Sequence, residues 1–569
     1  MDYAIPAIDL FAGPGGLNEG FSRFASWYGS DIRFKSVLSI EKDAAAAKTL
    51  TLRAFFRQFD EDTLPSDYWS VLRGEADPAV LRDYAEWSTA EDEVWQAELG
   101  RIPLEELHTR IAAKLKNRRD WLLLGGPPCQ AYSIVGRSRM TGIGFDARAN
   151  AKLDPKISET VQRARLKKFG GDVRHTLYRE YLRIIAVHQP AAFVMENVRG
   201  ILSALVPGDD SLMFDRIRAD LEDPWKALED DPDRRALANA ARAGRPRYRL
   251  FTFANPVAAD LWENQPDNRD FLIQAEEYGV PQKRHRVIVL GIRDDVDVEP
   301  GRLEPSAPST VRDAIGHLPP LRSGLSDAQD DFDEWARVRT LAVRELKKIV
   351  RDKAVSAALG QAVSEHAPLT RGSKFVAEKQ RKPQTTLERW LRPRPVNGFA
   401  QHETRSHMKS DVVRYVYAAC AAVALNRTPK LEHWPKELLP DHRNVIHDDK
   451  TGIREVGGFS DRFKVQRWRE PASTITSHIA KDGHYFIHPD PSQARSLTVR
   501  EAARLQTFPD DYFFCGNRTE AYSQVGNAVP PYLAVQLAGV VAPIFEALIG
   551  QSTKTSSRVP SKRGLTRVG

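Results

Sequence analysis

The octapeptide DLFAGPGG, residues 9–16, carries the strongest structural signal in the chain. It closes a short apolar run at 7–11, which predicts a buried strand, and it precedes a helical stretch expected over 17–27. A second apolar run, 36–40, ends in Glu41. Strand, glycine turn, helix and strand in this order predict the opening βαβ unit of a doubly wound sheet.

Further apolar runs extend the same pattern along the chain. We expect strands at 121–124, 192–195, 248–254 and 286–292, and helices at 175–187 and from Pro530 to about residue 548. Residues 44–118 are expected to be mainly helical. The sequence therefore predicts an α/β fold with a doubly wound, mostly parallel sheet.

Composition is that of an ordinary globular protein, with 569 residues, 41 % of them hydrophobic. No apolar run reaches the roughly 20 residues of a membrane span, because 533–550 is interrupted by Gln536, Pro543 and Glu546. The N-terminus lacks the pattern of an export signal, so we expect a cytoplasmic location. Three cysteines argue against both a disulfide framework and a cysteine-based zinc module, and no metal is expected.

Charge is unevenly distributed, although the net charge is only +7. Residues 335–430 hold 20 Lys and Arg against 7 Asp and Glu, and the tail 551–569 holds 5 basic residues and no acidic one. The rest of the chain is therefore acidic. A basic segment suggests a polyanionic partner. A solvated helical face with a loose terminus would explain the charge equally well.

One cysteine stands where a sheet presents its ligands. Cys129 follows Gly-Gly-Pro-Pro at the end of the strand expected at 121–124, and this edge of an open α/β sheet is where ligands bind. A reactive thiolate needs positive charge nearby, and Arg137 is close in sequence. The alternative is a buried, inert thiol, which fits Cys420 on an apolar helix better.

Two further positions repeat this placement of polar groups at strand ends. Glu196 follows the strand at 192–195, where a carboxyl in a mainly apolar pocket can serve as a proton donor. Arg284 and Arg286 alternate on one face of the strand that follows. The plainer alternatives are a loop glutamate and a solvated edge strand.

The glycine turn would let a ligand approach the backbone and the helix N-terminus closely. Glu41, 28 residues after Gly13, is placed to accept the hydroxyls of a ribose. The turn lacks the full GxGxxG spacing, which disfavours a nicotinamide cofactor. A glycine turn without a ligand remains the alternative.

Taken in order, these motifs resemble the DNA cytosine-5 methyltransferases, the bacterial restriction–modification type most closely. The shared series is DLFAGPGG at 9–16, Glu41, GPPCQAYS at 126–133, FVMENVRG at 193–200, YGVPQKRHRVIVLG at 278–291, RSLTVREAARLQTFPDDYFF at 495–514 and YSQVGNAVPPYLA at 522–534. The resemblance implies a Rossmann-like S-adenosylmethionine-dependent fold with a smaller recognition domain inserted before the C-terminal motifs.

The resemblance also implies roles for single residues. Cys129 would add to C6 of a flipped-out cytosine, Glu196 would contact N3 and the exocyclic amine, and Arg286, with Arg284, would hold O2. The residues implied to bind S-adenosylmethionine are Phe11, Ala12, Gly13, Gly15, Glu41, Pro128, Asn527 and Val529. The sequence departs from the family's pattern at two places. Lys42 stands where the family often has an aromatic residue, and the aspartate expected after the third strand has no counterpart in 99–102.

The motif order further implies four regions: a catalytic domain at 1–299, a target-recognition region at 300–500, a C-terminal segment at 501–550 that returns to the catalytic domain, and a basic, disordered tail at 551–569. The basic segment falls inside the recognition region. Candidates for DNA contact are Gln130, Ser133, Arg137, Arg371, Lys374, Arg381, Arg389, Arg392, Arg394 and Arg405.

The expected partners follow from the same resemblance. They are double-stranded DNA and a cognate restriction endonuclease that forms no stable complex with the protein. We expect a monomer that does not associate with a membrane. Methylation of an RNA such as tRNA, and a non-catalytic DNA-binding role, are the alternatives.

Overall fold

The computed structural model describes residues 3–60, 63–128, 173–206, 211–255, 266–326, 329–362, 368–379, 381–394, 396–440, 445–447, 454–456 and 461–556. Its centre is an eight-stranded sheet in the order β3-β2-β1-β4-β5-β9-β6, with β7 paired to β9. The strands are β1 (Tyr3–Leu10), β2 (Ile32–Glu41), β3 (Val94–Gln96), β4 (Leu122–Gly125), β5 (Ala192–Val198), β6 (Tyr248–Phe251), β7 (Leu272–Gln274) and β9 (His285–Arg293).

The strand directions confirm the predicted fold class. Strands β3, β2, β1, β4 and β5 are parallel neighbours, and β9 runs antiparallel to β5, β6 and β7. The order reverses between β1 and β4, where a doubly wound sheet places its ligand. Strand β3 lies inside the segment expected to be mainly helical, and its three residues pair only with the end of β2.

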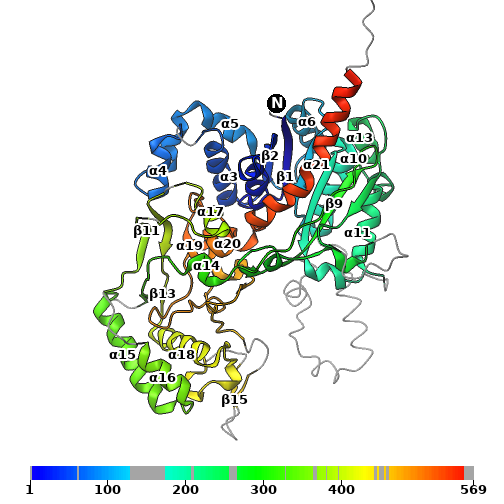
Figure 1. The fold of residues 1–569 in the computed structure, drawn as a ribbon. Coiled ribbons are helices and arrows are strands. Elements are labelled where there is room, and N and C mark those ends of the chain that lie inside the picture. The colour runs from blue at the N-terminus through cyan, green and yellow to red at the C-terminus, as the bar shows by residue number, and fades with distance from the viewer. Residues whose placement is uncertain are drawn as a thin grey trace, which may run out of the picture.

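Helices cover both faces of the sheet, as the side chains of β1 require. Ile5 and Ala7 join the core beneath α1 (Gly16–Ser22), α2 (Phe24–Tyr28) and α21 (Pro531–Ser556). Ile8 and Leu10 join the opposite core. The helices of that second face are α6 (Leu104–Leu115), α10 (Val173–His188), α11 (Met213–Glu222), α12 (Pro224–Ala227) and α13 (Arg234–Ala240). Figure 1 shows α21 crossing the sheet beside the N-terminal strands.

Helix α21 belongs to the core of the molecule. The stretch Arg518–Gly550 has a mean hydropathy of 1.9 over its most apolar window, enough by composition alone for a membrane span, and 56 % of that window is buried inside the fold. A Cβ added to Gly20 of α1 would lie 2.4 Å from the Cβ of Ala534. The two helices therefore meet backbone to backbone, and only glycine fits there.

The segment between α3 (Ala44–Phe56) and β3 joins the central sheet to part of the region 300–500. It forms α4 (Ser66–Arg73), a 3-10 helix (Pro78–Asp83) and α5 (Ala85–Glu93). Its buried Leu81 and Trp87 share a core with Val396 and Ala400. Gly74, at the end of α4, faces the Lys374 side chain of a hairpin made by β11 (Gly372–Ala377) and β12 (Gly398–Glu403).

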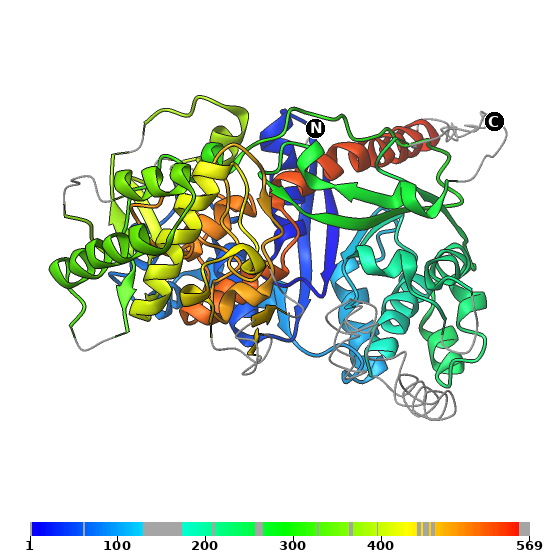
Figure 2. The same ribbon diagram turned by 90° about the horizontal axis from the view of Figure 1, so that it is seen from below.

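Within the segment 300–500, where target recognition is expected, residues 329–440 form a lobe with a core of its own, called the recognition lobe below. Its Trp335, Leu359 and Tyr415 are wholly buried. Figures 1 and 2 show its helices set apart from the sheet. They are α15 (Phe332–Ile349), α16 (Lys353–Gln361) and α18 (Lys409–Leu425). Short elements of 300–500 pack with the catalytic core instead, namely α14 (Val311–Ile315), α17 (Thr386–Leu391) and the short strand β16 (Ala472–Ser473).

The remaining short elements lie in these same regions or close the chain. The short strands are β8 (Gln282–Lys283), β10 (Gly324–Leu325), β13 (Ser406–His407), β14 (Val445–His447) and β15 (Arg454–Val456), and the last helices before α21 are α19 (Val499–Leu505) and α20 (Arg518–Asn527).

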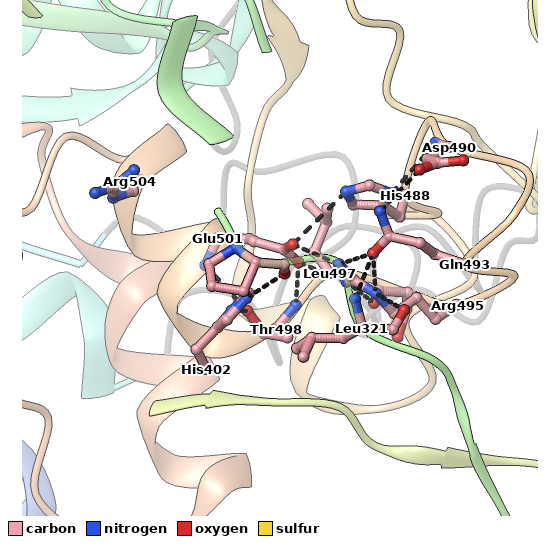
Figure 3. A network of polar contacts seen from close by, with 12 residues as sticks. Leu321, His402, His488, Asp490, Gln493, Arg495, Leu497, Thr498, Glu501 and Arg504 are labelled. Carbon is pink, nitrogen blue, oxygen red and sulfur yellow. Dashed lines mark hydrogen bonds and ion pairs between the residues drawn. The ribbon is translucent and has the colours of Figure 1, made fainter. Parts of the chain in front are cut away.

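A buried polar network fixes the start of α19 against the hairpin of β11 and β12, called the recognition hairpin below (Figure 3). Thr498 and Glu501 cap the helix reciprocally, and both guanidinium ends of Arg495 lie 2.7 Å from the Glu501 carboxylate. His402 of β12 bonds Thr498 Oγ1 at 3.0 Å and the Pro319 carbonyl at 3.0 Å. Because these groups satisfy one another away from water, they hold the two segments in one arrangement.

Candidate functional site

The glycine turn after β1 is held by the acid that ends β2. Glu41 Oε2 accepts a hydrogen bond from the Gly13 N–H at 2.8 Å, and its Oε1 accepts one from the Asp43 N–H at 2.8 Å. Burial raises the pKa of Glu41. A Cβ on Gly13, whose φ is +56°, would meet nothing within 4 Å, so the turn is open on that side. The expected strand-end carboxylate thus lies directly across from the turn.

The C-terminal motif returns to the same turn. A Cβ on Gly16 would lie 2.1 Å from the Val529 carbonyl oxygen, so the two backbones are in contact. Val529 is buried, whereas Asn527, the last residue of α20, is exposed. Of the predicted cofactor residues, the structure therefore gathers Gly13, Glu41 and Val529 around one loop, with Phe11, Ala12 and Gly15 inside that loop.

A carboxylate that the sequence analysis does not assign follows the third strand of the chain. Strand β3 ends at Gln96, and Glu98 follows two residues later, just before the segment 99–102. Glu98 is about one-third exposed and forms ion pairs with Arg101 at 3.0 Å and with Lys42 at 3.9 Å. Only the short apolar Val94-Trp95 pair signals this strand in the sequence.

A second group of polar side chains lies at the ends of β4, β5 and β9. Arg286 Nε and Glu196 Oε1 form an ion pair at 2.8 Å, and each side chain is about 15 % exposed. Asn197 Nδ2 donates to the Pro127 carbonyl at 3.3 Å. A Cβ on Gly126 would lie 2.9 Å from Glu196 Oε2. Gly126 and Pro127 are therefore fixed beside the Glu196–Arg286 pair.

Arg284 is close to this pair, but its guanidinium donates hydrogen bonds to main-chain carbonyls. Its Nη1 donates to the carbonyl of Ile475 at 2.9 Å and to that of Gly526 at 3.3 Å. The side chain is 1 % exposed, and burial, together with the neighbouring Arg286, lowers its pKa well below the usual value. Arg284 thus bridges the recognition region and the end of α20, just before Asn527.

Two of the three cysteine thiols are buried. Burial raises the pKa of Cys420 to about 12 and that of Cys515 to about 11, so neither forms a thiolate near neutral pH. Cys129 lies outside the described residues, as do the predicted DNA contacts Gln130, Ser133 and Arg137. Among the described residues, no group of three or more His, Cys, Asp or Glu side chains is placed to hold a metal ion.

Comparison with known proteins identifies the family of the chain. The family model for the C-5 cytosine-specific DNA methylases matches residues 84–207 and 270–542. The chain belongs to the C-5 cytosine-specific DNA methylase family. It is 29 % identical to the type II methyltransferase M.Bpa9945I of Bacillus paralicheniformis, over 95 % of this chain and 98 % of that protein.

Two further relatives extend this likeness. The chain is 24 % identical to the type II methyltransferase M.AgeI of Thalassovita gelatinovora, over 94 % of this chain and 98 % of that one. It is 26 % identical to the DNA (cytosine-5-)-methyltransferase M.ApeKI of Aeropyrum pernix, over 75 % and 82 % of the two chains. The protein is a DNA cytosine-5 methyltransferase.

Methyltransferases of this family use S-adenosylmethionine, and the turn has the features that such a ligand needs. Gly13 leaves the backbone accessible, and the Glu41 carboxylate keeps lone pairs beyond the two that its backbone donors occupy. Asp9 Oδ2, buried at the end of β1, has no hydrogen-bond partner among the described residues. These unused acceptor positions of the two carboxyl groups suit the polar groups of such a ligand.

The predicted recognition arginines differ in what their guanidinium groups contact. Arg371 pairs with Asp330 at 2.7 Å, Arg392 donates to the Arg381 carbonyl at 3.0 Å, and Arg405 donates to the Ile479 carbonyl at 2.7 Å. Arg392 and Arg405 are buried. Arg394 is half-buried, with its guanidinium 4.5 Å from the Phe56 ring. The exposed members of the set are Lys374, Arg381 and Arg389.

Proposed function

We propose that this methyltransferase acts through Cys129 on a cytosine flipped out of double-stranded DNA, at a defined target sequence within a restriction–modification system. Extrusion of the base costs a few kcal/mol, so the enzyme needs a pocket and a surface that holds the duplex. The ends of β4, β5 and β9 supply the pocket. The recognition lobe and the exposed Lys283 between Gln282 and Arg284 supply cationic surface beside it.

The thiol is required because cytosine C5 is a weak nucleophile. Addition of the Cys129 sulfur to C6 makes C5 enamine-like, and C5 then takes the methyl group that bound S-adenosylmethionine supplies. Loss of the C5 proton and elimination of the sulfur restore the ring and the free thiol. The Pro127-Pro128 segment, which precedes Cys129 in the sequence, is bonded to Asn197 at the edge of the sheet that holds Glu196.

Glu196 and Arg286 act on the polar edge of the base. In this proposal Glu196 holds the exocyclic amine and favours protonation at N3, and Arg286 donates to O2. Both roles compensate the negative charge that sulfur addition places on the ring. Their ion pair at 2.8 Å keeps each charge partnered while the pocket holds no base. Arg284 serves as a positioning residue, because main-chain carbonyls occupy its guanidinium.

On the cofactor side, Gly13 and Gly15 would border the methionine end and Glu41 the ribose, with Phe11 near the adenine. Pro128 would close the site from the segment after β4, and Asn527 and Val529 from the end of α20 and the loop after it. Glu98 takes the place of the missing aspartate in this proposal, because it is the acid that follows β3 and it remains partly exposed.

We further propose a monomeric, cytoplasmic enzyme encoded with a restriction endonuclease. The similarity to type II methyltransferases along almost the whole chain supports the link to a restriction endonuclease. RNA methylation is the less favoured function, since the matching family model describes DNA methylases.

The Glu196–Arg286 pair beside the Pro128 end of β4 is the observation that carries the proposal. The test is bisulfite sequencing of DNA from a methylation-free bacterial host that expresses the protein, with a Cys129→Ala strain as control. Protected cytosines at one short sequence, absent from the control, are expected. Methylation of host tRNA alone would overturn the assignment to DNA.

A further inference from the structure

The loop that follows α19, residues 507–514, lies between the recognition region and the cofactor turn. On the recognition side, the Asp510 N–H donates to the Leu391 carbonyl at 2.8 Å. The Phe514 N–H donates to Gln401 Oε1 at 3.0 Å, and Gln401 Nε2 donates back to the Phe514 carbonyl at 2.9 Å. Both ends of the loop are therefore attached to segments of the recognition region.

Arg500 of α19 strengthens this attachment. Its guanidinium donates to the carbonyl of Ala400 in β12 at 2.9 Å, and to the loop carbonyls of Pro509 at 3.0 Å and Tyr512 at 2.7 Å. The side chain is fully buried. Because one rigid, planar group bonds both main chains, the loop cannot shift relative to the hairpin without losing buried hydrogen bonds.

On its other side the loop contacts the cofactor turn. The Tyr512 hydroxyl donates to the carbonyl of Pro14, the residue between Gly13 and Gly15. A Cβ on Gly15 would lie 3.2 Å from that hydroxyl, so the contact is tight. Next to it, Arg53 pairs with Glu19 of α1 at 2.6 Å and with Asp511 at 3.2 Å. Tyr512 thus contacts the cofactor turn, and Arg53 links α1 to the loop 507–514.

We propose that Tyr512 is a positioning residue for the cofactor turn, and that Arg500 ties its contact with Pro14 to the recognition hairpin. The inference rests on the proposed cofactor role of the turn. The hydroxyl acts through the Pro14 carbonyl. Without it the turn would sample more conformations, and part of the affinity for S-adenosylmethionine would be lost in ordering it again.

The test compares Tyr512→Phe with a matched variant, Tyr248→Phe. Tyr248 of β6 is equally buried and also donates to a proline carbonyl, that of Pro190 at 3.0 Å, at the far edge of the sheet. We expect Tyr512→Phe to raise the KM for S-adenosylmethionine about fivefold, the value of one buried hydrogen bond. We expect kcat and the KM for unmethylated plasmid DNA to stay near wild type, and Tyr248→Phe to leave both KM values unchanged.

A second measurement reports on the conformational freedom of the cofactor turn and does not require methyl transfer. Amide hydrogen exchange of residues 11–17 in the cofactor-free protein should be faster in Tyr512→Phe and unchanged in Tyr248→Phe. Unaltered exchange in Tyr512→Phe would overturn the positioning role, as would equal KM values in the two variants. A wild-type protein that transfers no methyl group would contradict the proposed function instead, and the exchange comparison would still decide on Tyr512.

Discussion

The Nε of Arg286 lies 2.8 Å from the Glu196 carboxylate, although the two residues come from strands that run in opposite directions. Because β9 is antiparallel to β5, the first residues of β9 meet the last residues of β5 at one edge of the sheet. The reversed strand therefore brings a cation to the edge where the parallel strands present Glu196 and the Pro127-Pro128 segment.

Arg286→Lys is expected to lower kcat/KM for DNA about 10- to 100-fold, the value of a hydrogen bond to a charged group. Lysine keeps the charge, but it lacks the planar fork that can contact Glu196 and a base oxygen together. Methyl transfer to plasmid DNA measures kcat/KM. Calorimetry measures the affinity for S-adenosylhomocysteine, which should be unchanged.

Arg249→Lys is the control for that substitution, since Arg249 also pairs with a glutamate, Glu299, at 2.8 Å but on β6 at the far edge of the sheet. Equal losses of activity in the two variants would remove Arg286 from the site.

Cys129→Ala should reduce methyl transfer by at least ~10³-fold, because removal of a nucleophile abolishes the covalent route. Affinity for S-adenosylhomocysteine should persist, since the turn and Glu41 are untouched. Cys515→Ala is the control, because Cys515 is buried and burial raises the pKa of its thiol to about 11. Retained turnover in Cys129→Ala would exclude a covalent mechanism through this residue.

Glu41→Gln should raise the KM for S-adenosylmethionine about tenfold or more, the value of charge-assisted hydrogen bonds. The neutral amide offers one acceptor oxygen in place of two, so the Gly13 or the Asp43 N–H loses its partner. Glu91→Gln, an exposed acid on α5, should leave the KM unchanged. A normal KM in Glu41→Gln would remove Glu41 from the cofactor site.

Local sequence patterns were sufficient for the parts of this site that depend on neighbouring residues. Apolar runs located β1 and β2, and the strand-end rule placed Glu41 beside the turn, where it bonds Gly13. Strand β3 was missed because three residues are too few to show a period of two.

Local patterns cannot predict contacts between residues that are far apart in the sequence. Alternation along one strand put Arg284 and Arg286 on a common face, but β8 ends at Lys283 and β9 begins at His285. Arg284 lies in the break, and its partners Ile475 and Gly526 are 191 and 242 residues away. Arg405 is similar, since composition cannot show that it donates to the Ile479 carbonyl.

DNA affinity should fall steeply with salt, because each phosphate contact adds about 0.9 to the slope of log K against log salt. Lys283→Ala should reduce that slope by about one unit, because Lys283 is exposed next to the catalytic strand. Lys226→Ala, which removes an exposed cation on α12 outside the recognition lobe, should leave the slope unchanged. Fluorescence anisotropy at several salt concentrations measures both. A flat salt dependence would contradict electrostatic binding by the recognition lobe.

Asp9 should make the cofactor-free protein less stable as the pH rises from about 4 to 7. Burial, and then the charge of Glu41, raises the pKa of Asp9 from 3.8 to about 7. Within that window the unfolded chain releases the proton and the folded protein keeps it, so the free energy of unfolding decreases with pH. Asp9→Asn removes this penalty. The free energy of unfolding of the variant should exceed that of wild type by roughly 4 kcal/mol at pH 8 and match it near pH 4. Urea unfolding at the two pH values measures the difference, and a gap that does not change with pH would show that Asp9 ionises normally in the folded protein.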